Sequence, residues 1–289
     1  MFYLLATILL NVVIYSIFKL FPKFGINTLQ AVVANYCVCV ITGSLFTGNM
    51  PFTAETVHAN WFSWALLMGV GFISIFTLIA YCTRIDGITT TTIANKLSLV
   101  IPAICSIILY HDKVGIGKIT GILLAIPAIY LTTLVKDERN KPQNLFWPVI
   151  LFIGSGLLDT SVKFVQSRYL VSVASQAVYT TCCFAVAGSI GFVIVSVLLL
   201  FRKITFSWRS IGAGICLGIP NFFSIYFLIR MLNSNILQSS AAIPVLNIGI
   251  VVASSLTAIL VFREKANMLR FLGLALSVIA ILFIAFGDR

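Results

Sequence analysis

Lys96 and Asp159 are charged residues inside long apolar stretches, "IANKLSLVIP" (93–102) and "PVILFIGSGLLDTSVKFVQ" (148–166). A lysine at the centre of a membrane-spanning helix costs about 2.5–3.5 kcal/mol on insertion scales, so it normally faces a cavity or a partner. Lys96 is therefore a candidate anchor for a carboxylate or phosphate. A structural ion pair and a lysine kept neutral by burial are the alternatives. Asp159 is a candidate site for a coupling proton, or an ion-pair partner of Lys163 or Lys96.

The residues around Lys96 have the spacing of a helix face. Thr92, Asn95, Lys96 and Leu99 stand at i, i+3, i+4 and i+7, and three of these four are polar. A polar stripe on a membrane helix is expected to point into the protein, because lipid offers it no hydrogen bonds. Thr92 and Asn95 therefore join Lys96 as candidate substrate-binding residues.

Further polar side chains lie inside apolar stretches and are candidates for lining the same site. The alternative for the asparagines is an interhelical hydrogen bond, worth about 0.6 kcal/mol on average, and for the tyrosines it is aromatic packing. These candidates are Asn35, Tyr36, Tyr179, Asn221 and Asn247.

The composition indicates an integral membrane protein. Hydrophobic residues make up 60% of the 289 residues and charged residues only 9%, far from the balance of a soluble domain. The net charge of +11 does not indicate nucleic-acid binding, because the basic residues stand in the gaps between apolar stretches, as in membrane loops. The seven cysteines lie inside apolar stretches, so we expect neither disulfides nor a metal site, and no cofactor.

Apolar stretches long enough to span a membrane recur along the whole chain. We expect an all-α integral membrane protein with ten transmembrane helices. The expected ranges are 2–20, 27–47, 61–83, 88–110, 115–135, 145–166, 173–201, 209–231, 236–262 and 267–286. Pro102, Pro127, Pro220 and Pro244 fall inside these ranges and should kink the helices.

The two halves of the chain resemble each other. "QAV" at 30–32 recurs at 176–178, a shift of 146 (176 − 30). A shift of 152 (247 − 95) places Asn95 on Asn247, and the same shift places His111-Asp112-Lys113 on Arg263-Glu264-Lys265. This indicates duplication into two five-helix repeats, 1–135 and 145–289, joined by a charged linker at 136–144. Five helices are an odd number, so the second repeat is inverted in the membrane.

The segments 102–131 and 247–283 resemble the drug/metabolite transporter superfamily, of the EamA type. They read "PAICSIILYHDKVGIGKITGILLAIPAIYL" and "NIGIVVASSLTAILVFREKANMLRFLGLALSVIAILF". The Arg263-Glu264-Lys265 turn and Gly273 are similar to the family's Gly-Glu-Arg/Lys turn and downstream glycine, while the first half departs with His111-Asp112-Lys113. The resemblance implies alternating access around a central cavity, with the fifth and tenth helices outside it or at a contact in a homodimer.

The expected function is therefore secondary active transport of a small polar metabolite, such as an amino acid or a sugar phosphate. Lys96 favours an anionic or zwitterionic substrate, and transport is driven by protons or by exchange. A lipid or lipid-precursor flippase is the alternative. A membrane enzyme is remote, because His58 and His111 stand in expected loops without a nucleophile or metal ligands nearby. We expect a multi-pass protein of the cell (inner) membrane, and the sequence leaves the side of the termini open.

Overall fold

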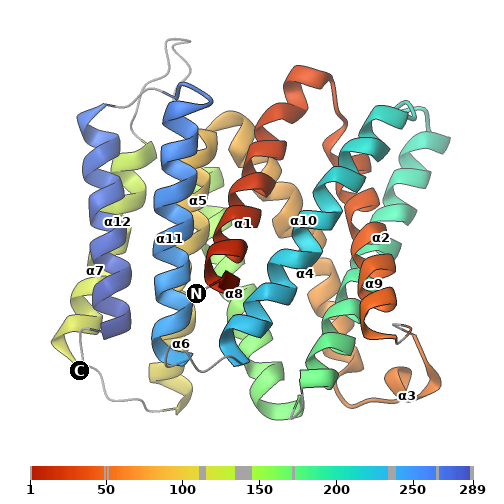
Figure 1. Cartoon of the computed structure of the whole chain (residues 1–289), viewed down its shortest axis with the longest axis horizontal. Coiled ribbons are helices and arrows are strands. Elements are labelled where there is room, and N and C mark those ends of the chain that lie inside the picture. The colour runs from red at the N-terminus through yellow and green to blue at the C-terminus, as the bar shows by residue number, and fades with distance from the viewer. Residues whose placement is uncertain are drawn as a thin grey trace. The chain divides into compact units, whose positions relative to one another are not determined.

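The computed structural model describes residues 2–48, 50, 52–110, 115–133, 145–170, 173–233, 239–264 and 267–286, and this part is helical without strands (Figure 1). The predicted linker at 136–144 and the His111-Asp112-Lys113 turn lie outside the described residues. The elements are α1 (Phe2–Leu20), η1 (Phe21–Phe24), α2 (Thr28–Thr47), α3 (Ala54–Val57), α4 (Phe62–Ile85), α5 (Gly87–Leu97), α6 (Val100–Tyr110), α7 (Ile116–Thr133), α8 (Phe146–Tyr169), α9 (Val173–Leu200), α10 (Trp208–Asn233), α11 (Ser239–Leu260) and α12 (Met268–Phe286).

The helices confirm a multi-pass membrane protein. Nine helical spans within the described residues are long and apolar enough to cross a bilayer, and one of them combines α5 with α6 as Gly87–Cys105. A shorter apolar stretch, Ile119–Leu131, lies in α7. The helix bounds follow the expected ranges to within three residues; α8, for example, is expected to end at 166 and ends at Tyr169. Large apolar side chains remain exposed on these helices, as a lipid-facing surface requires.

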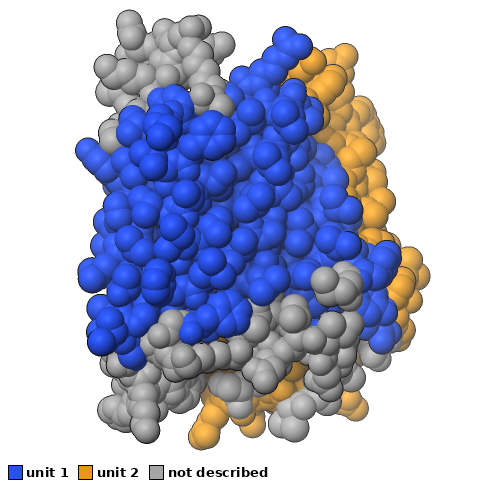
Figure 2. Space-filling view, turned by 60° about the vertical axis from the view of Figure 1, so that its left-hand side comes forward, with its two compact units in different colours: residues 1–19, 79–157, 224–289 blue, residues 20–78, 158–223 orange. Residues whose placement is uncertain are grey.

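Two compact units divide the chain, coloured separately in Figure 2. Unit 1 comprises Met1–Lys19, Ile79–Leu157 and Ser224–Arg289, and unit 2 comprises Leu20–Leu78 and Leu158–Phe223. Each unit therefore takes residues from both predicted halves, 1–135 and 145–289, and the duplication of these halves stays a prediction.

Unit 1 is built on α5, α7, α11 and α12. Helices α7 and α12 lie side by side (Figure 1). A Cβ atom on Gly121 of α7 would lie 2.7 Å from the backbone nitrogen of Ile284 and 2.8 Å from the carbonyl oxygen of Ala280. The two backbones therefore touch at this glycine, the close approach that small residues allow in membranes. The core beside them is Ile93, Leu97, Val100, Ala125, Ala128, Ile129, Val251, Ala280, Ile281 and Ile284.

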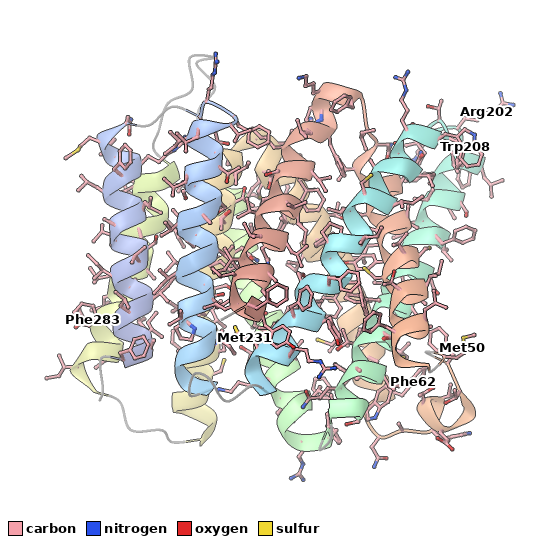
Figure 3. All side chains as sticks on the ribbon, in the orientation of Figure 1. Met50, Phe62, Arg202, Trp208, Met231 and Phe283 are labelled. Atoms are coloured by element: carbon pink, nitrogen blue, oxygen red, sulfur yellow. The ribbon has the colours of Figure 1, made fainter. Side chains whose placement is uncertain are left out.

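Unit 2 is built on α2 packed against α9. Helix α2 begins where the Asn27 side chain accepts a hydrogen bond from the Gln30 amide, and it ends at Gly48, whose φ of 70° is left-handed. The buried Gln30 side chain donates to the Thr205 carbonyl at 2.7 Å and accepts from the Ser207 amide at 3.0 Å. Arg202 and Trp208 lie at one end of this unit, and Met50 and Phe62 at the other (Figure 3).

The prediction of one continuous helix at 88–110 is wrong in one respect. The segment is interrupted at Ser98 and Leu99, which separate α5 from α6. Pro102 has no amide hydrogen, so the Ser98 carbonyl lacks its ordinary helical donor. The amide of Ile101 donates to that carbonyl instead, at 2.9 Å. A Cβ on Gly156 would lie 2.8 Å from the same oxygen, so α8 packs directly against the break.

The glycines of α4 and α10 serve mainly close packing. A Cβ on Gly69 would overlap Val186, one on Gly214 would overlap Ala31, and one on Gly218 would lie 2.8 Å from the Asn35 carbonyl. Gly212 has nothing within 4 Å and is the exception. Close packing of neighbouring helices therefore accounts for these three glycines.

Replacing Gly121 by alanine should lower the melting temperature of the purified protein. The added methyl group meets backbone atoms of α12, and overpacking of this kind costs about 1–3 kcal/mol. Gly212→Ala is the matched control and should be neutral or slightly stabilising, because its Cβ enters open space and alanine favours helices. Equal melting temperatures for the two variants in detergent would contradict the α7–α12 contact.

Candidate functional site

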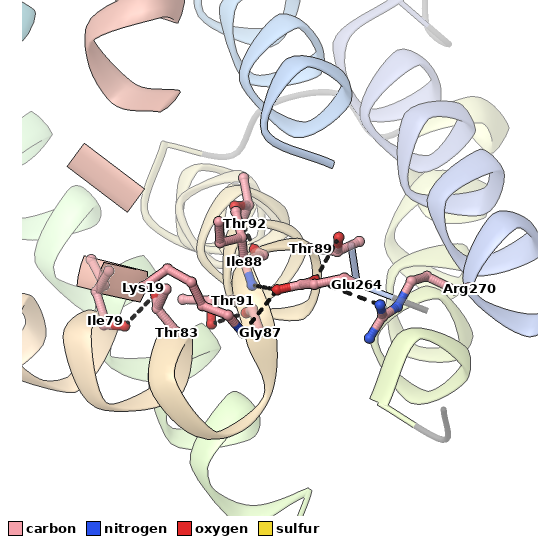
Figure 4. Close-up of polar contacts among 10 residues, drawn as sticks. All are labelled: Lys19, Ile79, Thr83, Gly87, Ile88, Thr89, Thr91, Thr92, Glu264 and Arg270. Carbon is pink, nitrogen blue, oxygen red and sulfur yellow. Dashed lines mark hydrogen bonds and ion pairs between the residues drawn. The ribbon is translucent and has the colours of Figure 1, made fainter. Parts of the chain in front are cut away.

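The carboxylate of Glu264 binds the N-terminus of helix α5, from a position far along the chain. The Ile88 amide donates to Glu264 Oε1 at 2.8 Å, and the Thr89 hydroxyl lies 3.4 Å from Glu264 Oε2 (Figure 4). The first amides of a helix have no partner within it, and they carry partial positive charge. Glu264 therefore serves as an N-terminal cap supplied by tertiary structure.

Two cations approach the same carboxylate. Lys19 Nζ at the end of α1 lies 3.0 Å from Glu264 Oε1, and Arg270 Nη1 in α12 lies 3.5 Å from Oε2. The Glu264 side chain is only 8% exposed, against 25% for Lys19 and 10% for Arg270. Burying a carboxylate is costly unless cations and hydrogen-bond donors surround it. The three side chains thus join α1, the start of α5 and the start of α12 at one end of unit 1.

The backbone conformations at Glu264 and at the start of α5 permit the contact between them. Arg263 has a φ of 51°, and the Glu264 amide donates to the Ala258 carbonyl at 2.9 Å, so the chain turns back as it leaves α11. Gly87 has a φ of 90°, and a Cβ there would lie 2.7 Å from Glu264 Oε1. A residue with a side chain at position 87 would be strained and would also push the carboxylate away.

Asp86 immediately precedes α5 and stands between two membrane-spanning segments. Its side chain makes no capping hydrogen bond, and its Oδ2 atom is buried without a hydrogen-bond partner in the described part of the protein. Desolvation raises the pKa of Asp86 to about 6, against the lowering effect of the nearby Lys19. This carboxyl group can therefore exchange a proton near neutral pH.

Asn95 is the centre of a second polar group in unit 1. Its Oδ1 accepts a hydrogen bond from the Tyr15 hydroxyl at 3.0 Å, and its Nδ2 donates to Ser155 Oγ at 2.9 Å. These side chains come from α1, α5 and α8. Lys96 follows Asn95, is half-buried and lies in the last turn of α5. An ammonium group there interacts favourably with the negative end of the helix dipole, which gives Lys96 a structural reason for its place.

The predicted stripe of Thr92, Asn95, Lys96 and Leu99 does not form one helix face. Helix α5 ends at Leu97, so Leu99 belongs to the break, where it packs on the apolar core of unit 1. Thr92 is fully buried, and its hydroxyl donates to the Ile88 carbonyl of its own helix at 2.7 Å. Only Asn95 and Lys96 of this stripe remain suited to contact a ligand.

The other predicted residues in unit 2 are mainly enclosed by protein. Asn221 Nδ2 donates to Asn35 Oδ1 at 3.1 Å, which links α10 to α2 as an interhelical hydrogen bond. The Tyr36 hydroxyl donates to the Phe72 carbonyl at 2.8 Å, and the Tyr179 ring packs edge-on against Trp61. Hydrogen bonding therefore accounts for Tyr36 and Asn221, whereas the Tyr179 hydroxyl and Asn35 Nδ2 are buried without a hydrogen-bond partner in the described part of the protein.

Asp159 and Asn247 remain candidates for the roles predicted from the sequence. Asp159 is exposed on the part of α8 that belongs to unit 2, and Asn247 is buried in α11 of unit 1. All seven cysteines are free thiols. Within the described residues, no three His, Cys, Asp or Glu side chains gather as metal ligands.

The sequence drew attention to the Arg263-Glu264-Lys265 turn as a family feature but did not assign Glu264 a partner. Two local signals were available. Asp86-Gly87 is a dipeptide typical of a turn with positive φ, and the four threonines from Thr89 to Thr92 open a membrane helix without a capping side chain. Neither signal reveals a carboxylate more than 170 residues away, as the separation of 176 between Ile88 and Glu264 shows.

Comparison with known proteins supports the fold over the whole chain. No family model matches the sequence. A protein of Haemophilus influenzae, named only as uncharacterized, is 25% identical over 295 residues, covering 99% of this chain and 98% of that protein. One solved crystal structure is 13% identical with a TM-score of 0.56, and the match covers 98% of this chain and 99% of that chain. At this identity the likeness concerns the fold alone.

Replacing Glu264 by alanine should lower the melting temperature strongly. The change removes the cap of α5 and leaves Lys19 and Arg270 without their shared carboxylate, and breaking such a buried pair costs about 3–5 kcal/mol. The melting temperature of the detergent-purified protein measures the effect. Glu55→Ala, at an exposed glutamate in the short helix α3, is the matched control and should change little.

Exchanging the charges of Lys19 and Glu264 separates capping from simple ion pairing. A pure ion pair would survive in the Lys19→Glu/Glu264→Lys double variant. We expect no recovery, because a lysine at 264 cannot accept the Ile88 amide and would be repelled by Arg270. A melting temperature close to that of the unmodified protein would show that the capping interaction is unimportant.

Proposed function

We propose that the protein is a secondary active transporter of a small polar metabolite, working by alternating access. The observation that carries the proposal is the break between α5 and α6 inside an apolar span, with Asn95 and Lys96 immediately before it. Non-helical backbone at membrane depth is tolerated only inside protein or beside a water-filled cavity, and broken helices form the binding sites of many transporters.

The polar groups next to the break indicate what such a substrate would be. Tyr15, Asn95 and Ser155 supply hydroxyl and amide groups from three helices, and Lys96 adds a positive charge. This combination suits an anionic or zwitterionic molecule, such as an amino acid or a sugar phosphate. Transport would be proton-coupled or an exchange, with Asp159 as the proton site that the sequence predicts.

The proposal includes the architecture of the drug/metabolite transporter superfamily, of the EamA type. In it α7 is a tenth spanning helix, since its 18 described residues extend about 27 Å and a hydrocarbon core is about 30 Å thick. The ten spans would form two inverted five-helix repeats in the cell (inner) membrane. A homodimer through the outer helices also belongs to this proposal.

A thermal-shift screen against metabolites tests the function and the role of Lys96 together. A ligand that binds the folded protein raises its melting temperature by an amount set by its concentration relative to its dissociation constant. We expect anionic or zwitterionic metabolites to stabilise the unmodified protein and the Lys163→Ala control, whose exposed lysine lies elsewhere on α8. Lys96→Ala should lose at least tenfold in affinity, about 1.4 kcal/mol.

The outcomes of this screen separate the alternatives. Retention of every hit by Lys96→Ala, with a lower melting temperature without ligand, would make Lys96 a structural charge at the end of α5. Stabilisation by lipid precursors, and by no soluble metabolite, would favour a flippase instead. Hits are then tested for uptake into proteoliposomes, and absence of uptake or exchange would contradict transport.

A further inference from the structure

Two carboxyl groups, those of Asp86 and Glu264, lie near the N-terminus of α5, and only Glu264 accepts a hydrogen bond from it. Asp86 occupies the N-cap position, where an aspartate ordinarily accepts the amides of the next two or three residues. The Ile88 amide donates to Glu264 instead, at 2.8 Å. Glu264 therefore caps α5 in place of Asp86, so helix capping does not explain the aspartate at position 86.

The charged and titratable groups around Asp86 come from several elements of unit 1. Lys19 on α1 acts on its carboxyl group electrostatically, and Cys82 stands one turn earlier on α4. Glu264, from the turn after α11, lies against the adjoining Gly87 and Ile88. Arg270 on α12 pairs with Glu264, and its connection to Asp86 is through that residue. Asp86 and Glu264 therefore share one nearby cation, Lys19.

The Oδ2 atom of Asp86 is a buried polar atom without a partner in the described part of the protein. A buried carboxylate without hydrogen bonds is costly, whereas a protonated carboxyl group avoids most of that cost. In this arrangement Lys19 lies 3.0 Å from Glu264, and the Oδ2 atom of Asp86 has no hydrogen-bond partner among the described residues.

We propose that Asp86 is a proton-binding site whose charge state controls the contact between Lys19 and Glu264. With the proton bound, Lys19 pairs with Glu264, which holds α1, α5 and α12 together. When Asp86 releases the proton, its carboxylate competes for Lys19 and weakens that attachment. Resting on the proposed transport function, this assigns to Asp86 a second proton site, separate from Asp159, at one end of unit 1.

The first test follows the protonated carboxyl band in infrared spectra of the full-length protein in lipid nanodiscs. Burial raises the pKa of Asp86 from 3.8 to about 6, so a band should disappear with a midpoint near pH 6. Asp86→Asn should lose this component, whereas Asp159→Asn should keep it. A component that persists in Asp86→Asn, or disappears in Asp159→Asn, overturns the proposal.

Variants of Lys19 and Glu264 should shift the midpoint in opposite directions, and they test the competition for Lys19 even if Asp86→Asn folds poorly. Lys19→Gln removes the cation that favours the ionised form, so the midpoint should rise. Glu264→Gln keeps an acceptor for the Ile88 amide but frees Lys19 to act on Asp86, so the midpoint should fall. Shifts in the same direction, or no shift in either variant, contradict the proposal.

Stability should depend on pH with a defined sign. Asp86 holds its proton more tightly in the folded protein than in the unfolded chain. The free energy of unfolding therefore falls as pH rises from about 4 to about 6, and it is flat above that window. In Asp86→Asn the melting temperature should lose this slope. An unchanged slope in that variant would assign the titration to another group and overturn the proton site.

Transport measurements distinguish failure of this inference from failure of the proposed function. If the screen yields a substrate but its pH-dependent uptake is unchanged in Asp86→Asn, the protein is a transporter and the coupling role of Asp86 is wrong. If the infrared titration belongs to Asp86 but no metabolite is transported, the proton site stands and the transport function is wrong.

Discussion

The attachment of the Glu264 carboxylate to the start of α5 is the interaction on which unit 1 depends. It satisfies the Ile88 amide and draws together Lys19 of α1 and Arg270 of α12 at one point. Each of these groups would be costly to bury alone, and together their opposite charges offset much of that cost. The glycine at position 87 is a consequence of this contact, because any larger residue would occupy the place of the carboxylate.

The same helix carries both polar sites of unit 1, one at each end. At its start α5 is held by Glu264, and at its end it stops beside Asn95 and Lys96 because Pro102 cannot supply an amide to Ser98. The helix has only 11 residues and packs through Ile93 and Leu97 on the core of unit 1. A short rigid element with polar contacts at both ends can transmit a change at one end to the other.

The sequence predicted the membrane class and the helices well, because long apolar stretches carry that information locally. It also predicted a distortion at Pro102, although not that the helix would end at Leu97. It failed for two polar residues, one with a local partner and one with a distant partner. Thr92 matched a polar stripe but bonds to its own helix, and Glu264 lay in an expected loop yet is one of the most enclosed charges described. Periodicity shows which face of a helix is polar, whereas long-range pairing depends on the fold.

Labelling of Cys82 tests most directly whether the contacts of Glu264 with Lys19, Arg270 and α5 keep this end of unit 1 packed. Cys82 is fully buried one turn before Asp86, so in a variant retaining only this cysteine its reaction with a soluble maleimide reports opening of the cluster. We predict slow labelling in the parent and labelling at least several-fold faster after Glu264→Gln, with no change after Glu55→Gln. Equal labelling rates in the parent and Glu264→Gln, with full reaction of both after denaturation, would contradict the account.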